Sequence, residues 1–181
     1  RRTARYLRVR LRQQREATLG PEFYNRATLI NTLVTSSQVR RAMAELESQG
    51  HTTAKLQRLA LRHAKLIAAD MSYAKIRIFL SLLTWFWNRL YNGVHVKGLH
   101  ELAETSTTHT LVYVPSHRSH VDYLVLSYAL YTRGLMIPHI AAGDNLNMPV
   151  VGRFLRGGGA FFMRRSFRED PLYAAVFSEY V

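Results

Sequence analysis

The chain has 181 residues, of which 48% are apolar and 11% aromatic, a composition that allows a packed core and argues against wholesale disorder. Its 25 Lys and Arg against 12 Asp and Glu give a formal charge of +13, which attracts nucleic acid, an anionic membrane surface or phosphorylated substrates. There is no cysteine, so disulfides, zinc–cysteine sites and thiol nucleophiles are excluded.

The first part of the chain, residues 1–92, is expected to be mainly helical. Near its start, apolar residues alternate with arginine over residues 7–12, which fits a strand and equally an Arg-rich helix. Residues 25–49 have helical periodicity, and we expect two helices with a break near residues 35–37. Gly50 is well suited to end the second of them.

The longest periodic stretch, residues 52–92, contains a very apolar segment from Ile78 to Trp87, and an interruption is expected near residues 70–72. The apolar segment is too short to span a bilayer, and the sequence has no run of about 18 uncharged apolar residues. It either lies in a membrane interface, where Trp and basic residues are favoured, or packs as an ordinary buried helix. Both interpretations stay open, although basic residues flank the segment: Lys75, Arg77 and Arg89.

Beyond Gly93, short β-like runs alternate with helices, which predicts an α/β fold with a mostly parallel sheet. The change in character places a domain boundary between residues 92 and 93, so that residues 93–181 form a second region. The expected strands are residues 94–97, 110–114, 137–141 and 160–163. The expected helices are residues 120–132, residues 150–155 and a last helix that starts near Asp170–Pro171, with Pro in its first turn.

One polar loop combines the residues that acid–base chemistry needs: His117-Arg118-Ser119-His120-Val121-Asp122. It lies between an expected strand and an expected helix, and α/β folds place active sites in such loops. A carboxylate at one imidazole nitrogen fixes the tautomer and raises the basicity of the other nitrogen. Asp122 could act in this way on His117, which would then take a proton from a substrate hydroxyl. The spacing alone is a weak motif, and a capping or core histidine is the alternative.

A second segment, Gly157 to Arg165, joins three glycines to an apolar strand and two adjacent arginines. Glycines allow the backbone to approach a ligand closely, and Arg can bind phosphate in a bidentate fashion. Because strand neighbours alternate, only one of Arg164 and Arg165 can point to a given face. Taken alone, a flexible turn with two solvated arginines is the simpler interpretation. Together with the His–Asp loop, the segment suits an alcohol that also carries phosphate.

These two segments resemble motifs of the glycerolipid acyltransferase family. His117 to Asp122 resembles the His-x4-Asp motif, and Gly159 to Arg165 resembles the second motif, Gly-x-x-Phe-Ile-x-Arg, with Met163 in place of Ile. Further segments are similar to the bacterial membrane-bound glycerol-3-phosphate 1-O-acyltransferases in particular, so the resemblance spans nearly the whole chain. These segments are Pro138–Asn147, Trp87–Tyr91 and Arg1–Arg5.

The resemblance implies transfer of a fatty acyl group to the 1-hydroxyl of sn-glycerol 3-phosphate, which gives lysophosphatidate in phospholipid biosynthesis. The donor would be acyl carrier protein or coenzyme A, and no metal or other cofactor is implied. His117 would be the general base and Asp122 its partner. The expected substrate-binding residues all lie in the two motifs: Gly159, Phe162, Arg165, Arg164, Arg118 and Ser119. The implied location is the cytoplasmic face of the bacterial inner membrane, on an anionic lipid surface and without nucleic acid.

The chain also departs from the family, because the third motif, around Glu-Gly-x-Arg, and the proline-containing fourth motif do not occur in it. It starts with Arg1 rather than Met, and it stops at Val181 inside an apolar-periodic stretch. We therefore expect an N-terminal or central piece of a longer enzyme, with residues 93–181 as the first part of a catalytic domain.

Two other classes of function stay open, a basic nucleic-acid-binding module and a non-catalytic regulatory domain of a lipid enzyme. The charge and the aromatic residues fit the first of these classes. The arginines, however, are scattered through apolar-periodic elements, and no helix-turn-helix or RNA-binding signature appears. Salt-dependent binding to generic DNA would favour the nucleic-acid module, whereas acyl transfer that is lost with His117 would favour the enzyme.

Overall fold

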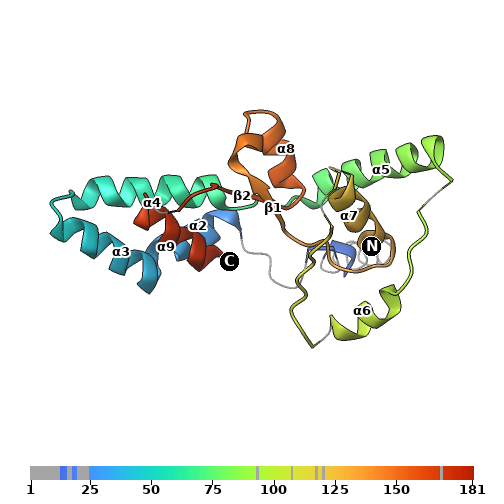
Figure 1. Ribbon diagram of the computed structural model, residues 1–181, viewed down its shortest axis with the longest axis horizontal. Coiled ribbons are helices and arrows are strands. Elements are labelled where there is room, and N and C mark those ends of the chain that lie inside the picture. Colours follow the sequence, from blue (N-terminus) through green and yellow to red (C-terminus); the bar gives the residue numbers. More distant parts are fainter. Residues whose placement is uncertain are drawn as a thin grey trace, which may run out of the picture. The chain divides into compact units, whose positions relative to one another are not determined.

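The chain folds into two compact units, Arg1–Phe23 with Met71–Pro138 and Tyr24–Asp70 with His139–Val181. The computed structural model describes residues 13–15, 18–19, 25–92, 94–106, 108–116, 118–119, 121–167 and 169–181 (Figure 1). Each unit combines segments from both sides of residue 92, so neither coincides with a predicted region, and the boundary at 92/93 stays a prediction. The segment 7–12, for which a strand or a helix was considered, lies outside the described residues.

In the second unit, helices α2 (Arg26–Thr35), α3 (Ser37–Ser48), α4 (Thr53–Ile67) and α9 (Pro171–Tyr180) pack together. Ser36 ends α2 and caps α3, because its Oγ accepts a hydrogen bond from the backbone N–H of Val39 at 3.3 Å. The predicted break between two helices is thereby confirmed. Gly50, with a φ of 96°, follows the end of α3 in the left-handed region that glycine adopts readily.

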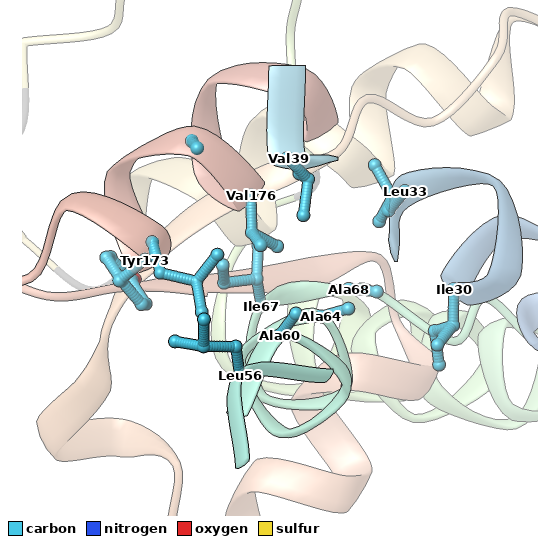
Figure 2. Close-up of a cluster of buried hydrophobic side chains, with 12 residues drawn as sticks. Ile30, Leu33, Val39, Leu56, Ala60, Ala64, Ile67, Ala68, Tyr173 and Val176 are labelled. Carbon is cyan, nitrogen blue, oxygen red and sulfur yellow. The ribbon is translucent and has the colours of Figure 1, made fainter. Parts of the chain in front are cut away.

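A single apolar core holds these four helices together, and Figure 2 shows its buried side chains. From α4 it takes Leu56, Ala60, Ala64 and Ile67, whose spacing of three and four residues places them on one face. From α9 it takes Leu172, Tyr173 and Val176, all almost completely buried. This burial anchors α9 and fixes its first turn, which borders the second of the two predicted motifs.

Two short parallel strands in the same unit, β1 (Ile140–Gly143) and β2 (Ala160–Met163), confirm the α/β class and the parallel pairing. The register runs from Ile140 opposite Ala160 to Gly143 opposite Met163. The 3-10 helix η1 (Asp144–Leu146) and helix α8 (Val151–Gly157) connect the strands, as parallel pairing requires. Strand 160–163 and the helix near 150–155 are confirmed, whereas the strand expected at 137–141 lies at 140–143.

The first unit contains helices α5 (Tyr73–Leu90), α6 (Leu99–Thr105) and α7 (Asp122–Thr132). The buried face of α5 is Ile76, Leu80, Leu83 and Trp87, which pack with Ile137 and with partly buried residues of α7. The predicted interruption near residues 70–72 and the helix expected over 120–132 are confirmed. None of the helices in the described part of the chain is long and apolar enough to cross a membrane.

Two predicted strands of this unit are wrong, since residues 94–97 and 110–114 have irregular backbone and the unpredicted α6 lies between them. Val112 and Val114 are 83% and 88% exposed. A β-strand is stabilised by pairing with a neighbouring strand and by packing of one face. These segments pair with no strand among the described residues, although Val94, Val96 and Tyr113 pack against apolar clusters, so composition and partial burial alone do not make a strand.

Candidate functional site

The two motif segments belong to different units, the His-x4-Asp loop to the first and the Gly159–Arg165 segment to the second. His117 and His120 lie outside the described residues, so the predicted contact between His117 and Asp122 stays a prediction. Asp122, Arg118 and Ser119 are described, as is nearly all of the second segment.

Asp122 organises the loop before α7 through its carboxylate. Its Oδ2 atom accepts hydrogen bonds from the backbone N–H groups of Arg118 at 2.9 Å and Ser119 at 2.8 Å. The Ser119 side chain adds a bond, because its Oγ accepts from the backbone N–H of Val121 at 3.2 Å. Ser119 thus acts on the backbone of the loop, while the Arg118 side chain is exposed.

The position of Asp122 leaves part of its carboxylate available for another donor. It is the first residue of α7, where the helix dipole favours a negative charge. Both of its recorded hydrogen bonds go to Oδ2, so within the described residues Oδ1 keeps its acceptor capacity. An imidazole N–H from the same loop is a chemically suitable donor for that oxygen.

Phe162, predicted to bind substrate, lies in the core of the second unit. Its side chain is 2% exposed and packs with Ala142 and Ala160 of the sheet. The guanidinium carbon of Arg156 lies 4.7 Å from the centre of its ring, a cation–π contact. In this position Phe162 shapes the sheet beneath the motif, and its predicted contact with substrate stays a prediction.

Arg156 is a buried cation that the sequence analysis missed. Its guanidinium donates to the carbonyl oxygens of Leu66 at 3.0 Å and Ala68 at 2.6 Å and to Oδ1 of Asn147 at 2.9 Å. Burial lowers the pKa of Arg156, and these acceptors offset the cost of removing the charge from water. Arg156 thereby joins the end of α4 to the loop after β1 and to Phe162.

The two arginines that end the second motif have different surroundings. Arg164 is held: its Nη1 donates to Oδ2 of Asp170 at 2.8 Å, and its backbone N–H donates to the Tyr173 hydroxyl at 3.0 Å. Its guanidinium carbon also lies 4.4 Å from the centre of the Tyr173 ring. Arg165 is exposed and has no hydrogen bond or ion pair within the described part of the chain. Arg165 is therefore the more accessible of the two for an anionic ligand.

Gly159 makes the turn that leads into this motif. It follows the end of α8 with a φ of 105°, a conformation that glycine adopts at no steric cost. Its carbonyl accepts from the backbone N–H of Ile140 at 3.0 Å and so starts the pairing of β1 with β2. The glycine is required here by backbone geometry, which agrees with the predicted role in shaping the entry to the strand.

Asp170 connects three elements of the second unit. Its Oδ1 caps α9 by accepting from the backbone N–H of Tyr173 at 3.0 Å, and its Oδ2 bonds Arg164. The same Oδ2 lies 3.2 Å from Nε2 of His63, a buried residue of α4. Neither ring nitrogen of His63 has an aligned hydrogen-bond partner in the described residues. Burial lowers the pKa of His63, with Asp170 opposing the shift, so we treat the ring as neutral near pH 7.

Sequence reasoning identified Asp170 only as the start of a helix and gave His63, within the periodic stretch 52–92, no role of its own. The Asp-Pro pair was the available signal for an N-terminal cap. A histidine on the core-facing side of α4 indicated a buried polar group but named no partner. The contacts of Asp170 with Arg164 and His63 depend on how α9 packs on α4, which one sequence does not reveal.

Several known proteins with one name are similar to this chain over nearly its whole length. Residues 93–181 match the family described as Acyltransferase. The whole chain is 48% identical over 178 residues to the glycerol-3-phosphate acyltransferase of Pseudomonas putida KT2440, covering 98% of this chain and 22% of that protein. The protein of the same name from Pseudomonas aeruginosa PAO1 is 49% identical over 178 residues, with 98% and 21% covered. That from Pseudomonas syringae pv. syringae B728a is 47% identical over 180 residues, with 99% and 22% covered.

Proposed function

We propose that the full-length protein is an acyltransferase of the family that residues 93–181 match, and that it acylates the 1-hydroxyl of sn-glycerol 3-phosphate. The observation that carries the proposal is the identity of 48% over 98% of the chain with a glycerol-3-phosphate acyltransferase. This chain spans 22% of that relative's length, so activity and substrates are proposed for the longer protein. The similarity favours the enzyme over a nucleic-acid-binding module.

The proposed chemistry is a general-base acyl transfer. His117 removes the proton from the 1-hydroxyl, and the oxygen then attacks the thioester carbonyl of acyl-coenzyme A or acyl carrier protein. The new bond joins that oxygen to the acyl carbon, the carbon–sulfur bond breaks, and the departing thiolate takes the proton from the imidazolium. Asp122 holds the imidazole tautomer and stabilises the cation that forms. The free Oδ1 of Asp122, among the described residues, supports this assignment.

Arg165 is our candidate for the phosphate of glycerol 3-phosphate. It is exposed, whereas the guanidinium of Arg164 is already paired with Asp170 and stacked on Tyr173. A free guanidinium can form bidentate, charge-assisted bonds with a phosphate dianion. Arg164 and Ser119 stay secondary candidates, since their contacts are structural. Arg118, which is exposed as Arg165 is, stays a second candidate for an anionic ligand.

Steady-state kinetics of the full-length protein test the proposal, with glycerol 3-phosphate and the acyl donor varied separately. Arg165→Ala should raise the KM for glycerol 3-phosphate about ten- to a hundredfold, because charge-assisted hydrogen bonds to the phosphate are lost. The KM for the acyl donor should change little, and Arg164→Ala, the matched control, should have a milder effect. An equal rise in both KM values, or a larger effect of Arg164→Ala, would assign the phosphate contact to another residue.

We further propose that the protein works on an anionic membrane surface at the cytoplasmic face of the inner membrane, within phospholipid synthesis. What supports this is the second face of α5, where Ile78, Leu82 and Trp85 are between 56% and 66% exposed. This α5 surface lies opposite the buried ridge of the helix, and exposed basic residues border it: Lys75, Arg77 and Arg89. Apolar side chains, a Trp and flanking cations form the pattern that interfacial helices use.

A further inference from the structure

The α9 N-terminus holds Arg164 at three points, and this geometry bears on the neighbouring residue. Asp170 bonds the guanidinium, the Tyr173 hydroxyl accepts from the backbone N–H, and the Tyr173 ring lies under the guanidinium. Arg164 directly follows β2, and Arg165 lies at the bend that comes next, with its side chain exposed. Holding Arg164 against α9 therefore fixes the backbone from which Arg165 extends into solvent.

Tyr173 and Asp170, which hold Arg164, are themselves held by packing and hydrogen bonds. Tyr173 is 2% exposed and packs edge-on against the ring of His63, at a centroid distance of 5.3 Å. Phe167 stacks on Tyr173, with ring centroids 5.7 Å apart. Asp170 is fixed by capping α9 and by its approach to the buried imidazole of His63. The atoms that hold Arg164 thus belong to the packed core of one unit.

We propose that Asp170 is a positioning residue for phosphate recognition, because it fixes Arg164 and through it the direction in which Arg165 meets the phosphate. This inference rests on the proposed function, in which Arg165 binds the phosphate of glycerol 3-phosphate. Asp170 does not contact the substrate, and its carboxylate accepts hydrogen bonds within the protein from Arg164 and from the backbone of Tyr173.

Charge repulsion and positioning predict opposite changes in the KM for glycerol 3-phosphate when Asp170 is neutralised. A carboxylate near a phosphate site repels the substrate dianion, so its neutralisation should lower the KM for glycerol 3-phosphate if charge alone matters. If Asp170 instead fixes Arg164, its neutralisation should raise that KM, since Arg165 is then no longer held in the orientation that binds. The direction of the change separates the two effects.

The experiment compares Asp170→Asn with Glu169→Gln in the full-length protein. The Asn amide keeps an oxygen for the cap of α9 but loses the charge that pairs with Arg164, so the helix is retained. Glu169 is the adjacent exposed acid and has no recorded contact with Arg164, so Glu169→Gln removes one charge from the same turn. Asp170→Asn should raise the KM for glycerol 3-phosphate about five- to twentyfold at little change in kcat, while Glu169→Gln should leave it unchanged or lower it.

A double-mutant cycle then tests whether Asp170 acts through Arg165. In the Arg165→Ala background, Asp170→Asn should produce no further rise in the KM, because the group that it positions is already absent. Arg164→Gln removes the same ion pair from the other side and should behave as Asp170→Asn does, which also covers poor folding of the Asp170 variant. Additive effects, or a fall in kcat at constant KM, would overturn the positioning role while leaving the Arg165 assignment intact. An Arg165→Ala variant with an unchanged KM would instead remove the proposed phosphate contact, and this inference with it.

Discussion

Asp122 has two separable functions at the scale of a single residue. One is structural, since Oδ2 accepts the backbone N–H groups of Arg118 and Ser119 and closes the loop before α7. The other is the proposed electrostatic one, in which the charge of the carboxylate stabilises the imidazolium of His117 during acyl transfer. The structural function needs an acceptor oxygen, whereas the electrostatic one needs the negative charge.

Two substitutions at this position should therefore have different effects. Asp122→Asn keeps an acceptor for the two N–H groups, and we expect a near-normal unfolding free energy but a severe loss of turnover. Asp122→Ala removes both functions and should also lower the unfolding free energy by about 1–2 kcal/mol. Urea unfolding and acyl-transfer rates of the two variants provide the comparison. Full turnover in Asp122→Asn would show that the charge has no part in the reaction.

At the scale of elements, α8 and the loop after β1 approach each other very closely at Gly152. A Cβ atom added there would lie 2.9 Å from backbone atoms of Asn147. Asn147 has little freedom to move, because its Oδ1 accepts a hydrogen bond from the buried guanidinium of Arg156 at 2.9 Å. Because Gly152 has no side chain, α8 can pack this closely against the loop after β1, directly before the second motif.

Gly152→Ala should destabilise the chain by about 1–3 kcal/mol, the usual range for an overpacked site. Gly158→Ala is the matched control, since its nearest neighbour would be the Leu155 carbonyl at 3.4 Å and its φ of −87° suits any residue. The change in unfolding free energy, measured in urea for both variants, shows whether the close contact with Asn147 makes a side chain at residue 152 costly. Equal destabilisation by the two substitutions would mean that the close approach at Asn147 relaxes without cost.

The elements differ in how far the sequence predicts them, and the reason is the range of the interactions that form them. The break between α2 and α3 and the start of α9 depend on the local caps Ser36 and Asp170, so both were predicted. Residues 110–114 have the composition of a strand but no pairing partner among the described residues, and pairing is non-local. The same limit applies to the site: the motif residues were found, but the contacts of Arg156 and Asp170 across the core were not.

At the scale of the whole molecule, each compact unit combines residues from distant parts of the chain. The His-x4-Asp loop belongs to one unit and Arg165 to the other. The sequence predicts a domain boundary at residue 92/93 because helices give way there to alternating β-like runs and helices. This pattern contains no information on which helices pack together. Both motifs take part in the proposed reaction, so their roles are tested in the full-length protein.

Attachment to a membrane is also a property of the whole molecule, because it combines the net charge of +13 with the α5 surface. The full-length protein should float with vesicles that contain anionic lipid, and less so at high salt. Replacing Leu82 and Trp85 by Ser should weaken binding about tenfold or more, because two apolar side chains no longer enter the interface.

The matched control for this experiment replaces Val112 and Val114 by Ser, which removes two apolar side chains that are more exposed than Leu82 and Trp85 from another segment of the same unit. That variant should bind vesicles as the unmodified protein does. Recovery of the unmodified protein in the soluble fraction, equal with and without lipid, would show that the α5 surface does not contact the membrane.

The most direct test of the whole account is the rate of acyl transfer to glycerol 3-phosphate by the full-length protein with His117→Ala. Loss of a general base should lower turnover about 10²–10⁴-fold, while the affinity for glycerol 3-phosphate, measured by calorimetry, stays close to that of the unmodified protein. Such a result would assign the proton transfer to His117 and the phosphate contact to other residues. Near-normal turnover in the variant would contradict the assignment of the base and, with it, the proposed mechanism.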